Sequence, residues 1–407
     1  MSIATVAVAP GASAPAPAPI DADQRLHAPD ILRGLALFGM ILVHFHQKTR
    51  VEVAGLEDLI GWGVWIFLEQ KAWGIFAFLF GVGFAVLLRR LEARGAAVAP
   101  IYLRRLAMLA VFGMVAEVGF GFHILFEYAC WGVALLVVRR WSTRTLLVTA
   151  ALAACARPVA AELAALHAWW VHAAPAGPAA TAALSQAVQA AARQGHYATL
   201  LSARWALFVR TLVPTWRQLL PSVNLALFIL GLLAVRHRIF DQPRHHVRLI
   251  AGGMAFGALS WAAAWLLLRR IPELAVPGAR WPLEAGLGII HDQWLCLTYI
   301  GAVVLLLAYR PEWTGRLAMF GSAGRMALTN YMVQAAMLDL LASEHGAGLK
   351  LRPLAYVPAA MLLFGIEAAA SAAWLARYRY GPLEWVWRTV TYARAQPLRL
   401  PARTAPS

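Results

Sequence analysis

Long apolar stretches recur along the whole chain, and each is close to the length that a helix needs to cross a bilayer. A spanning helix presents roughly 20 mostly apolar residues, because its backbone polar groups must pair within the helix when hydrocarbon surrounds them. The pattern predicts an all-α polytopic membrane bundle of about ten transmembrane helices, a single domain over residues 25–395. The ten stretches are 31–46, 71–88, 103–122, 124–138, 145–166, 219–235, 249–268, 287–308, 327–342 and 354–376.

Three segments depart from this pattern. Residues 1–24 are rich in Ala and Pro and lack the basic start of a signal peptide, which predicts a disordered cytoplasmic tail. Residues 396–407 predict a flexible basic tail. The longest loop, 167–217, contains an amphipathic stretch, and we expect an interfacial helix there, on the external face.

The charge of the chain supports a membrane location. Only 14% of the residues are charged, whereas soluble proteins have roughly 25%, and the net charge is +16. In a soluble protein this excess would suggest a nucleic-acid partner. Here most Arg residues lie at alternate ends of the apolar stretches, which predicts that both termini are cytoplasmic. Membrane lipids are therefore the expected partner, and nucleic acid is not.

Metal chemistry is not expected. The three cysteines lie inside apolar stretches without CxxC spacing, and the chain contains no HExxH motif. We therefore expect no dedicated metal site and no tightly bound cofactor.

Two ionisable residues of the first stretch, Arg33 and His44, are candidates for function. They are 11 positions apart, which places them about 20° from eclipsed and about 16 Å apart along the axis of a helix. Arg33 could bind a phosphate or carboxylate near the inner headgroups, and His44 could act as a general base. Alternatively, Arg33 is a positive-inside anchor and His44 an interfacial residue.

Three further candidates lie where the third and fourth stretches meet: Glu117, His123 and Glu127. His123 and Glu127 are spaced i, i+4 and could form a base with its orienting carboxylate. A structural hydrogen bond between helices is the alternative reading.

The ninth stretch begins with a polar series at helical spacing: Arg325, Thr329, Asn330 and Gln334. The pairs Arg325–Thr329 and Asn330–Gln334 could line a seam for the amides of an acyl donor. They could equally fasten two helices together.

Near the C-terminus, Gly381 and Pro382 predict the end of a helix and the start of a short interfacial one. Glu384 and Arg388 are spaced i, i+4 and could form an ion pair on it. Arg388, together with Arg377, is a candidate for binding an anion at the cytoplasmic side.

Glycines Gly74, Gly81 and Gly83 recur in the second stretch. A phosphate-binding glycine loop requires a preceding strand, so these residues predict close packing between membrane helices instead.

Three strings together resemble the YeiB-like family of bacterial inner-membrane proteins of unknown function: DILRGLALFGMILVHF, FGSAGRMALTNYMVQAAMLDLL and RYRYGPLEWVWRTVTY. The resemblance extends from about Asp30 to Tyr392. That family is grouped with the transmembrane acyltransferases, so the resemblance implies an enzyme that moves an acyl group from cytoplasmic acyl-CoA to a glycan or lipid acceptor at the far face. Some of those acyltransferases have an Arg, ten residues and a His in the first helix, and Arg33 and His44 match that spacing.

The chain departs from the family pattern at several positions. YeiB-like proteins more usually have Asn where this chain has His44, and His123 stands in place of an Asp. A histidine of the third stretch is replaced by Ala116. The polar residues could therefore form a rebuilt catalytic site, or the original chemistry could be lost.

Three functions remain open on the sequence alone. The first is an O-acyltransferase with acyl-CoA as co-substrate, the second a transporter of a small anion or lipid, and the third a non-catalytic scaffold. The sequence is compatible with a monomer or a homo-oligomer.

Overall fold

The structure is a computed structural model that describes residues 27–49, 51, 54–122, 124–171, 179–212, 220–274 and 280–400. Within those residues it is all α-helical, as the sequence predicts, and contains no strand beyond one isolated bridge between Tyr378 and Arg399. The predicted tail 1–24 and residues 401–407 lie outside the described part.

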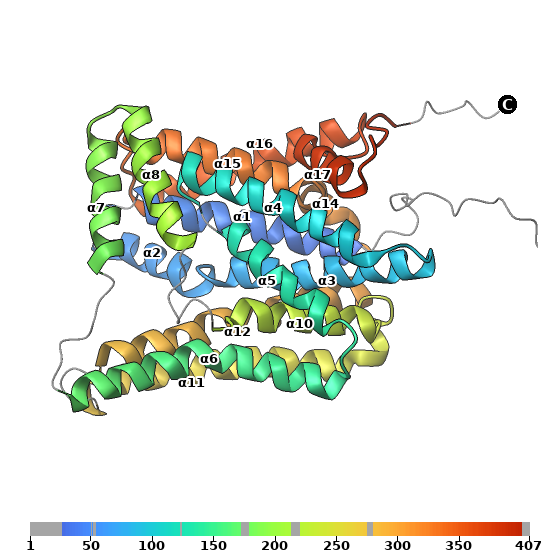
Figure 1. The fold of residues 1–407 in the computed structure, drawn as a ribbon, viewed down its shortest axis with the longest axis horizontal. Helices are drawn as coiled ribbons and strands as arrows, with labels where there is room; N and C mark the ends of the chain where they lie inside the picture. Colours follow the sequence, from blue (N-terminus) through green and yellow to red (C-terminus); the bar gives the residue numbers. More distant parts are fainter. Residues whose placement is uncertain are drawn as a thin grey trace, which may run out of the picture.

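The helices are mostly long and run roughly along one common direction (Figure 1). Their bounds are α1 His27–Thr49, α2 Leu56–Phe67, α3 Lys71–Ala93, α4 Val98–Phe120, α5 Ile124–Val138, α6 Thr143–Trp170, α7 Ala179–Arg193, α8 Tyr197–Leu212, α10 Val223–Arg236, α11 Val247–Leu274, α12 Arg280–Tyr309, α13 Trp313–Arg316, α14 Ala318–Arg325, α15 Ala327–Ala342, α16 Pro353–Leu375 and α17 Pro382–Tyr392, with a 3₁₀ turn at Pro243–His246.

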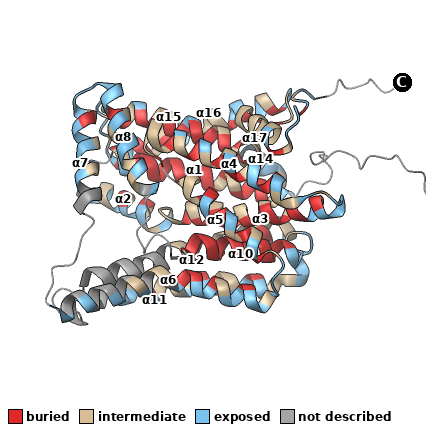
Figure 2. Ribbon diagram, viewed as in Figure 1, coloured by how far each residue is buried: buried red, intermediate tan, exposed pale blue. Residues whose placement is uncertain are grey.

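Helices α1, α3 and α10 form the interior of the bundle (Figure 2). They are apolar on nearly every face, which is the pattern of a helix surrounded by other helices. Helix α1 contacts α3, α14, α15 and α16, and α10 contacts α3, α5 and α6. Helices α6, α11 and α12 form an outer layer beside α10, and α6, α11 and α16 expose apolar side chains on their outward faces.

The crossing of α3 and α10 depends on glycine at two positions. A Cβ atom on Gly81 would overlap the carbonyl oxygen of Phe228, and a Cβ atom on Gly231 would overlap that of Phe78. The backbones therefore touch directly, as the glycines of this stretch predict. Gly83 differs, because a Cβ atom there would meet nothing within 4 Å.

Five helical segments of the described chain are long and apolar enough to span a membrane: His27–Thr49, Leu56–Ala93, Val98–Phe120, Pro243–Leu267 and Pro353–Leu375. Shorter apolar helices occur at Ile124–Val138, Val223–Arg236 and Gln293–Tyr309. A helix overlaps each of the ten predicted stretches.

The fold contains helices that were not predicted, among them α13 and α14, which lie between the eighth and ninth stretches. Helix α2 lies between the first and second predicted stretches. The described part of the loop 167–217 contains the helices α7 and α8 where one interfacial helix was expected, and these pack against each other at one end of the bundle (Figure 1).

Candidate functional site

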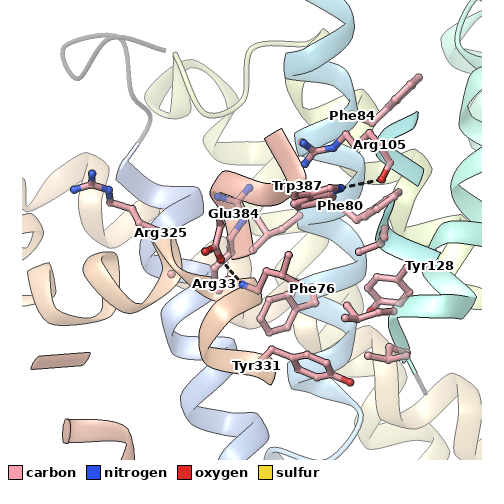
Figure 3. A pocket seen from close by; sticks show the side chains of 18 of the residues that line it. Arg33, Phe76, Phe80, Phe84, Arg105, Tyr128, Arg325, Tyr331, Glu384 and Trp387 are labelled. Carbon is pink, nitrogen blue, oxygen red and sulfur yellow. Dashed lines mark hydrogen bonds between the residues drawn. The ribbon is translucent and has the colours of Figure 1, made fainter. Parts of the chain in front are cut away.

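A cavity of about 210 Å³ lies among α1, α3, α4, α5, α15 and α17 (Figure 3). Its polar lining consists of Asp30, Arg33, Arg105, Arg325, Glu384 and Arg388. The remaining lining is mainly aromatic and aliphatic: Met40, Trp73, Phe76, Leu79, Phe80, Gly83, Phe84, Tyr102, Leu109, Ile124, Leu125, Tyr128, Gly324, Ala327, Leu328, Tyr331 and Trp387.

The charged residues gather at one end of this cavity, which we call the arginine end and define by Arg33, Arg105, Arg325 and Arg388. Arg33 and Arg105 lie early in α1 and α4, and Arg325 ends α14, immediately before α15. Four arginines and two carboxylic residues, Asp30 and Glu384, line this end, so it has an excess of positive charge, although the Arg325 guanidinium points away from Glu384 (Figure 3).

Two of these arginines are held in place by defined contacts. Arg33 donates from Nη1 to Asp30 Oδ1 at 2.6 Å. The guanidinium carbon of Arg105 lies 3.7 Å from the ring centre of Trp387, whose indole N–H donates to the Arg105 carbonyl at 2.8 Å. The charges of Arg388 and Arg33 both act on Arg105, so an anion placed among them would relieve their mutual repulsion.

Glu384 has a structural role at the same end. Its Oε1 accepts from the backbone N–H groups of Leu328 and Thr329, at 2.7 and 3.0 Å, and its Oε2 accepts from the Thr329 hydroxyl at 2.6 Å. Burial raises the pKa of the Glu384 carboxyl, and the hydrogen bonds from Thr329 and Leu328 oppose that rise. The carboxyl group thus caps the N-terminus of α15 from α17. The predicted ion pair between Glu384 and Arg388 is wrong, since Arg388 instead lies over the Tyr380 ring at 4.7 Å.

Away from the arginines, the walls become apolar (Figure 3). Phe76 and Phe80 of α3 face Tyr128 of α5, whose hydroxyl donates to the Trp73 carbonyl at 2.8 Å. The site is therefore amphiphilic: it would accommodate an anionic group at one end and an uncharged chain behind it.

His44 does not line this cavity. Met40, which does, is one helical turn before it on α1. The imidazole is buried and packs edge-on against Phe122, with ring centres 4.5 Å apart. In this conformation the imidazole lies one turn beyond the α1 wall of the cavity.

The other predicted catalytic residues are not gathered in the cavity. Glu117 is half-buried on α4, and Glu127 pairs with Arg157 at 3.5 Å. His123 lies outside the described residues. The structure therefore does not bring Glu127 and Glu117 to the arginine end.

The polar series of α15 fastens helices together. Thr329 bonds to Glu384 of α17, while Asn330 Nδ2 donates to the Ser371 hydroxyl at 2.9 Å. Gln334 donates to Glu367 at 2.7 Å. These contacts agree with the alternative that the polar series fastens two helices together. Of its four residues, only Arg325 lines the cavity.

Of the predicted anion-binding residues, Arg33, Arg325 and Arg388 all line the cavity, whereas Arg377 is exposed and does not. The sequence did not predict a role for Arg105, because an arginine at the end of an apolar stretch is already accounted for by membrane orientation. It also did not predict a role for Trp387, on which Arg105 stacks. No group of three or more His, Cys, Asp or Glu side chains that could hold a metal ion occurs in the described part of the chain.

Comparisons with known proteins agree with a membrane protein of this kind. Residues 25–182 match the family described as heparan-alpha-glucosaminide N-acetyltransferase, catalytic. Residues 234–394 match a family described as a protein of unknown function, DUF418. No solved structure matches the chain.

The curated relatives are uncharacterised bacterial proteins. YxaH of Bacillus subtilis is 28% identical and covers 92% of this chain and 96% of its own length. A 39.9 kDa protein encoded in the amylase 3′ region of Bacillus acidopullulyticus is 27% identical, covering 93% and 97%. YeiB of Escherichia coli is 27% identical over 34% of this chain and 32% of its own.

Apolar helices around an amphiphilic cavity define the chain as a helical membrane protein. More particularly, it is similar to the YeiB-like proteins of unknown function, through the family match of residues 234–394 and the similarity to YeiB.

Proposed function

We propose that the protein is a membrane acyltransferase that takes an acyl group from cytoplasmic acyl-CoA and transfers it to a hydroxyl acceptor at the opposite face of the bacterial inner membrane. In this proposal the chain spans the membrane about ten times, both termini are cytoplasmic, and the arginine end faces the cytoplasm. The match of residues 25–182 to an acetyltransferase catalytic family supports the reaction class.

The observation that carries the proposal is the polarity of the cavity. Four arginines line one end, and aromatic side chains line much of the rest, in the order that an acyl-CoA molecule would require. Its phosphates suit guanidinium groups, which donate in a fixed fork. Its pantetheine arm and acyl group would lie along the aromatic walls.

The volume indicates which part of the donor enters. Sites that enclose drug-sized ligands have volumes of about 300–1,000 Å³, whereas this cavity has about 210 Å³. We therefore expect the acyl-pantetheine arm to enter while the nucleotide stays outside the mouth. The arm would point along α1 from Arg33 towards Met40, and thus towards His44.

His44 is the proposed general base. A neutral imidazole can remove the proton of an attacking hydroxyl, which contributes about 10² to 10⁴ in rate. His44 is one turn beyond Met40, and the Phe122 ring packs against its imidazole. The reaction therefore requires the Phe122 ring to move away from the imidazole.

The experiment is a measurement of CoA release and acetyl-CoA binding by the full-length protein in nanodiscs made from bacterial envelope lipids. We expect His44→Ala to lower CoA release by about 10² to 10⁴ while the affinity for acetyl-CoA is retained. His27→Ala removes an exposed histidine at the other end of α1 and should change neither quantity. Wild-type protein that neither binds acetyl-CoA nor releases CoA, or a fully active His44→Ala variant, would contradict the proposal.

A further inference from the structure

A buried cluster of charged side chains lies at the end of the bundle away from the arginines. We call it the α8 end and define it by Arg204, Asp339 and His345. Arg204 of α8 donates to both carboxylate oxygens of Asp339, at 2.5 and 3.1 Å, and to the carbonyl of Gly119. His345 Nε2 lies 3.3 Å from Asp339 Oδ2. The Ser343 hydroxyl also donates to Asp339 Oδ1, at 2.8 Å, so the carboxylate is already shared among three partners.

Three helices show that this cluster and the arginine end are opposite. Helix α1 begins near Arg33 and ends near Lys48, α4 runs from Arg105 to Gly119, and α15 runs from its Glu384 cap to Asp339. Figure 1 shows the same separation, with α7 and α8 at one end and α17 at the other.

Lys48 adds a second cation to the α8 end. It is half-buried in the last turn of α1, and the charges of Asp339 and Arg204 act on it. Its Nζ lies 5.2 Å from the centre of the Phe122 ring. Among the residues that the structure describes, it forms no ion pair, so two cations here face one carboxylate that is already paired.

The position of Lys48 connects it to His44. The two residues are four positions apart on α1 and share one face of the helix. Both contact the same Phe122 ring, the imidazole at 4.5 Å and the ammonium at 5.2 Å between centres. A molecule whose anionic group reached Lys48 would place neighbouring atoms next to His44.

We propose that Lys48 forms an anion-binding acceptor site at the α8 end, and that the acceptor is a hydroxyl compound carrying a carboxylate or a phosphate. The inference rests on the proposed acyltransferase function, because that function requires an acceptor. In the reaction, the hydroxyl oxygen of the acceptor bonds to the acyl carbon and its proton passes to His44. The thioester C–S bond breaks, and the CoA thiolate leaves and takes up a proton, which yields an ester and CoA.

The test compares anionic and neutral probes of the same shape. Methyl β-D-glucuronoside is paired with methyl β-D-glucoside, and glycerol phosphate with glycerol, in calorimetric titrations of the full-length protein in nanodiscs. We expect wild type to bind the anionic member of at least one pair about tenfold more tightly than the neutral member, as a charge-assisted contact would give. The pair that shows the preference identifies the anion as carboxylate or phosphate.

Two variants assign the preference to one residue. Lys48→Gln should abolish it. Lys350→Gln removes the same charge from an exposed residue and should leave the preference unchanged. Lys350 is close to the end of α1, because the N–H of the neighbouring Leu351 donates to the Thr49 carbonyl at 2.9 Å. An unaltered preference in Lys48→Gln, or a wild type without any preference, overturns the inference.

Acetyl-CoA binding and CoA release, measured on the same samples, separate this inference from the proposed function. Retained acetyl-CoA binding and CoA release without an anion preference would contradict the acceptor site alone. A wild-type protein that shows neither acetyl-CoA binding, nor CoA release, nor an anion preference would contradict the proposed function as well.

Discussion

At the scale of single residues, Arg33 is the side chain whose role is easiest to isolate. It lines the cavity from α1 and is oriented by Asp30 at 2.6 Å. Its spacing from His44 made Arg33 a candidate on sequence grounds. Arg325 was a separate candidate, because it begins a polar series at helical spacing. The position of Arg105 could not be predicted, because its stacking on Trp387 joins residues 282 positions apart in the chain.

We predict that Arg33→Gln raises the KM for acetyl-CoA about tenfold, because one phosphate contact is lost, and changes kcat little. The measurement is steady-state CoA release in nanodiscs. Arg377→Gln, which removes an exposed arginine outside the cavity, should leave KM unchanged. Equal effects of the two substitutions would show that only the general positive charge matters.

At the scale of helices, α17 organises the arginine end by capping α15. Glu384 satisfies two backbone N–H groups at the start of α15 that have no partner within that helix. The sequence predicted the short helix after Pro382 but not this contact, because local spacing suggested Arg388 as the partner. A contact between residues 55 positions apart is set by tertiary packing, which the i, i+4 rule does not describe.

Replacing Glu384 with Ala should lower the free energy of unfolding by about 2 kcal/mol, since it leaves buried donors without an acceptor. Thermal unfolding of the purified protein in detergent measures this change. Glu312→Ala, at an exposed glutamate 3.9 Å from Arg310, should have little effect. The cap would have no energetic role if both variants unfolded at the same temperature.

A second prediction at this scale concerns the α3–α10 crossing. Gly81→Ala should destabilise the protein by about 1–3 kcal/mol, because its Cβ atom overlaps the Phe228 backbone and the helices must separate. Gly83→Ala, two residues further along the same helix, should be neutral or slightly stabilising, because nothing lies within 4 Å. A reversed order of stability would mean that the two helices do not cross at Gly81.

The length of the apolar stretches was enough to predict where long helices occur, since a helix overlaps each of the ten predicted stretches. Helix α2 was missed because its stretch contains Glu57 and Asp58 in the first turn and is short for a span. The contact of α8 with α15 was missed because Arg204–Asp339, which joins the two helices, links residues 135 positions apart. Patterns of period 3.6 identify helices, but long-range polar contacts determine which helices meet.

At the scale of the whole molecule, the protein has two charged ends joined by α1. The arginine end and the α8 end both have more cations than carboxylates, and the aromatic cavity and Phe122 lie between them. This arrangement suits an anionic donor at one end and an anionic acceptor at the other.

The two ends should lie on opposite sides of the membrane. In a background without native cysteines, Arg94→Cys, after α3, should react with a maleimide only after the inner face is exposed, whereas Lys350→Cys should react in spheroplasts that remain sealed. Both positions are exposed. Labelling of both from the same side would contradict the orientation.

The central claim is that the cavity binds the acyl donor, and filling it with a leucine at Gly83 tests this most directly. A Cβ atom at Gly83 meets nothing within 4 Å, and the residue lines the cavity, so the new side chain occupies the proposed site without displacing the backbone. Gly252→Leu, at an equally open position on α11 outside the cavity, is the matched control. We predict that Gly83→Leu weakens acetyl-CoA binding about tenfold or more at an unchanged unfolding temperature, and that Gly252→Leu does not. Undiminished acetyl-CoA affinity in Gly83→Leu would contradict the account.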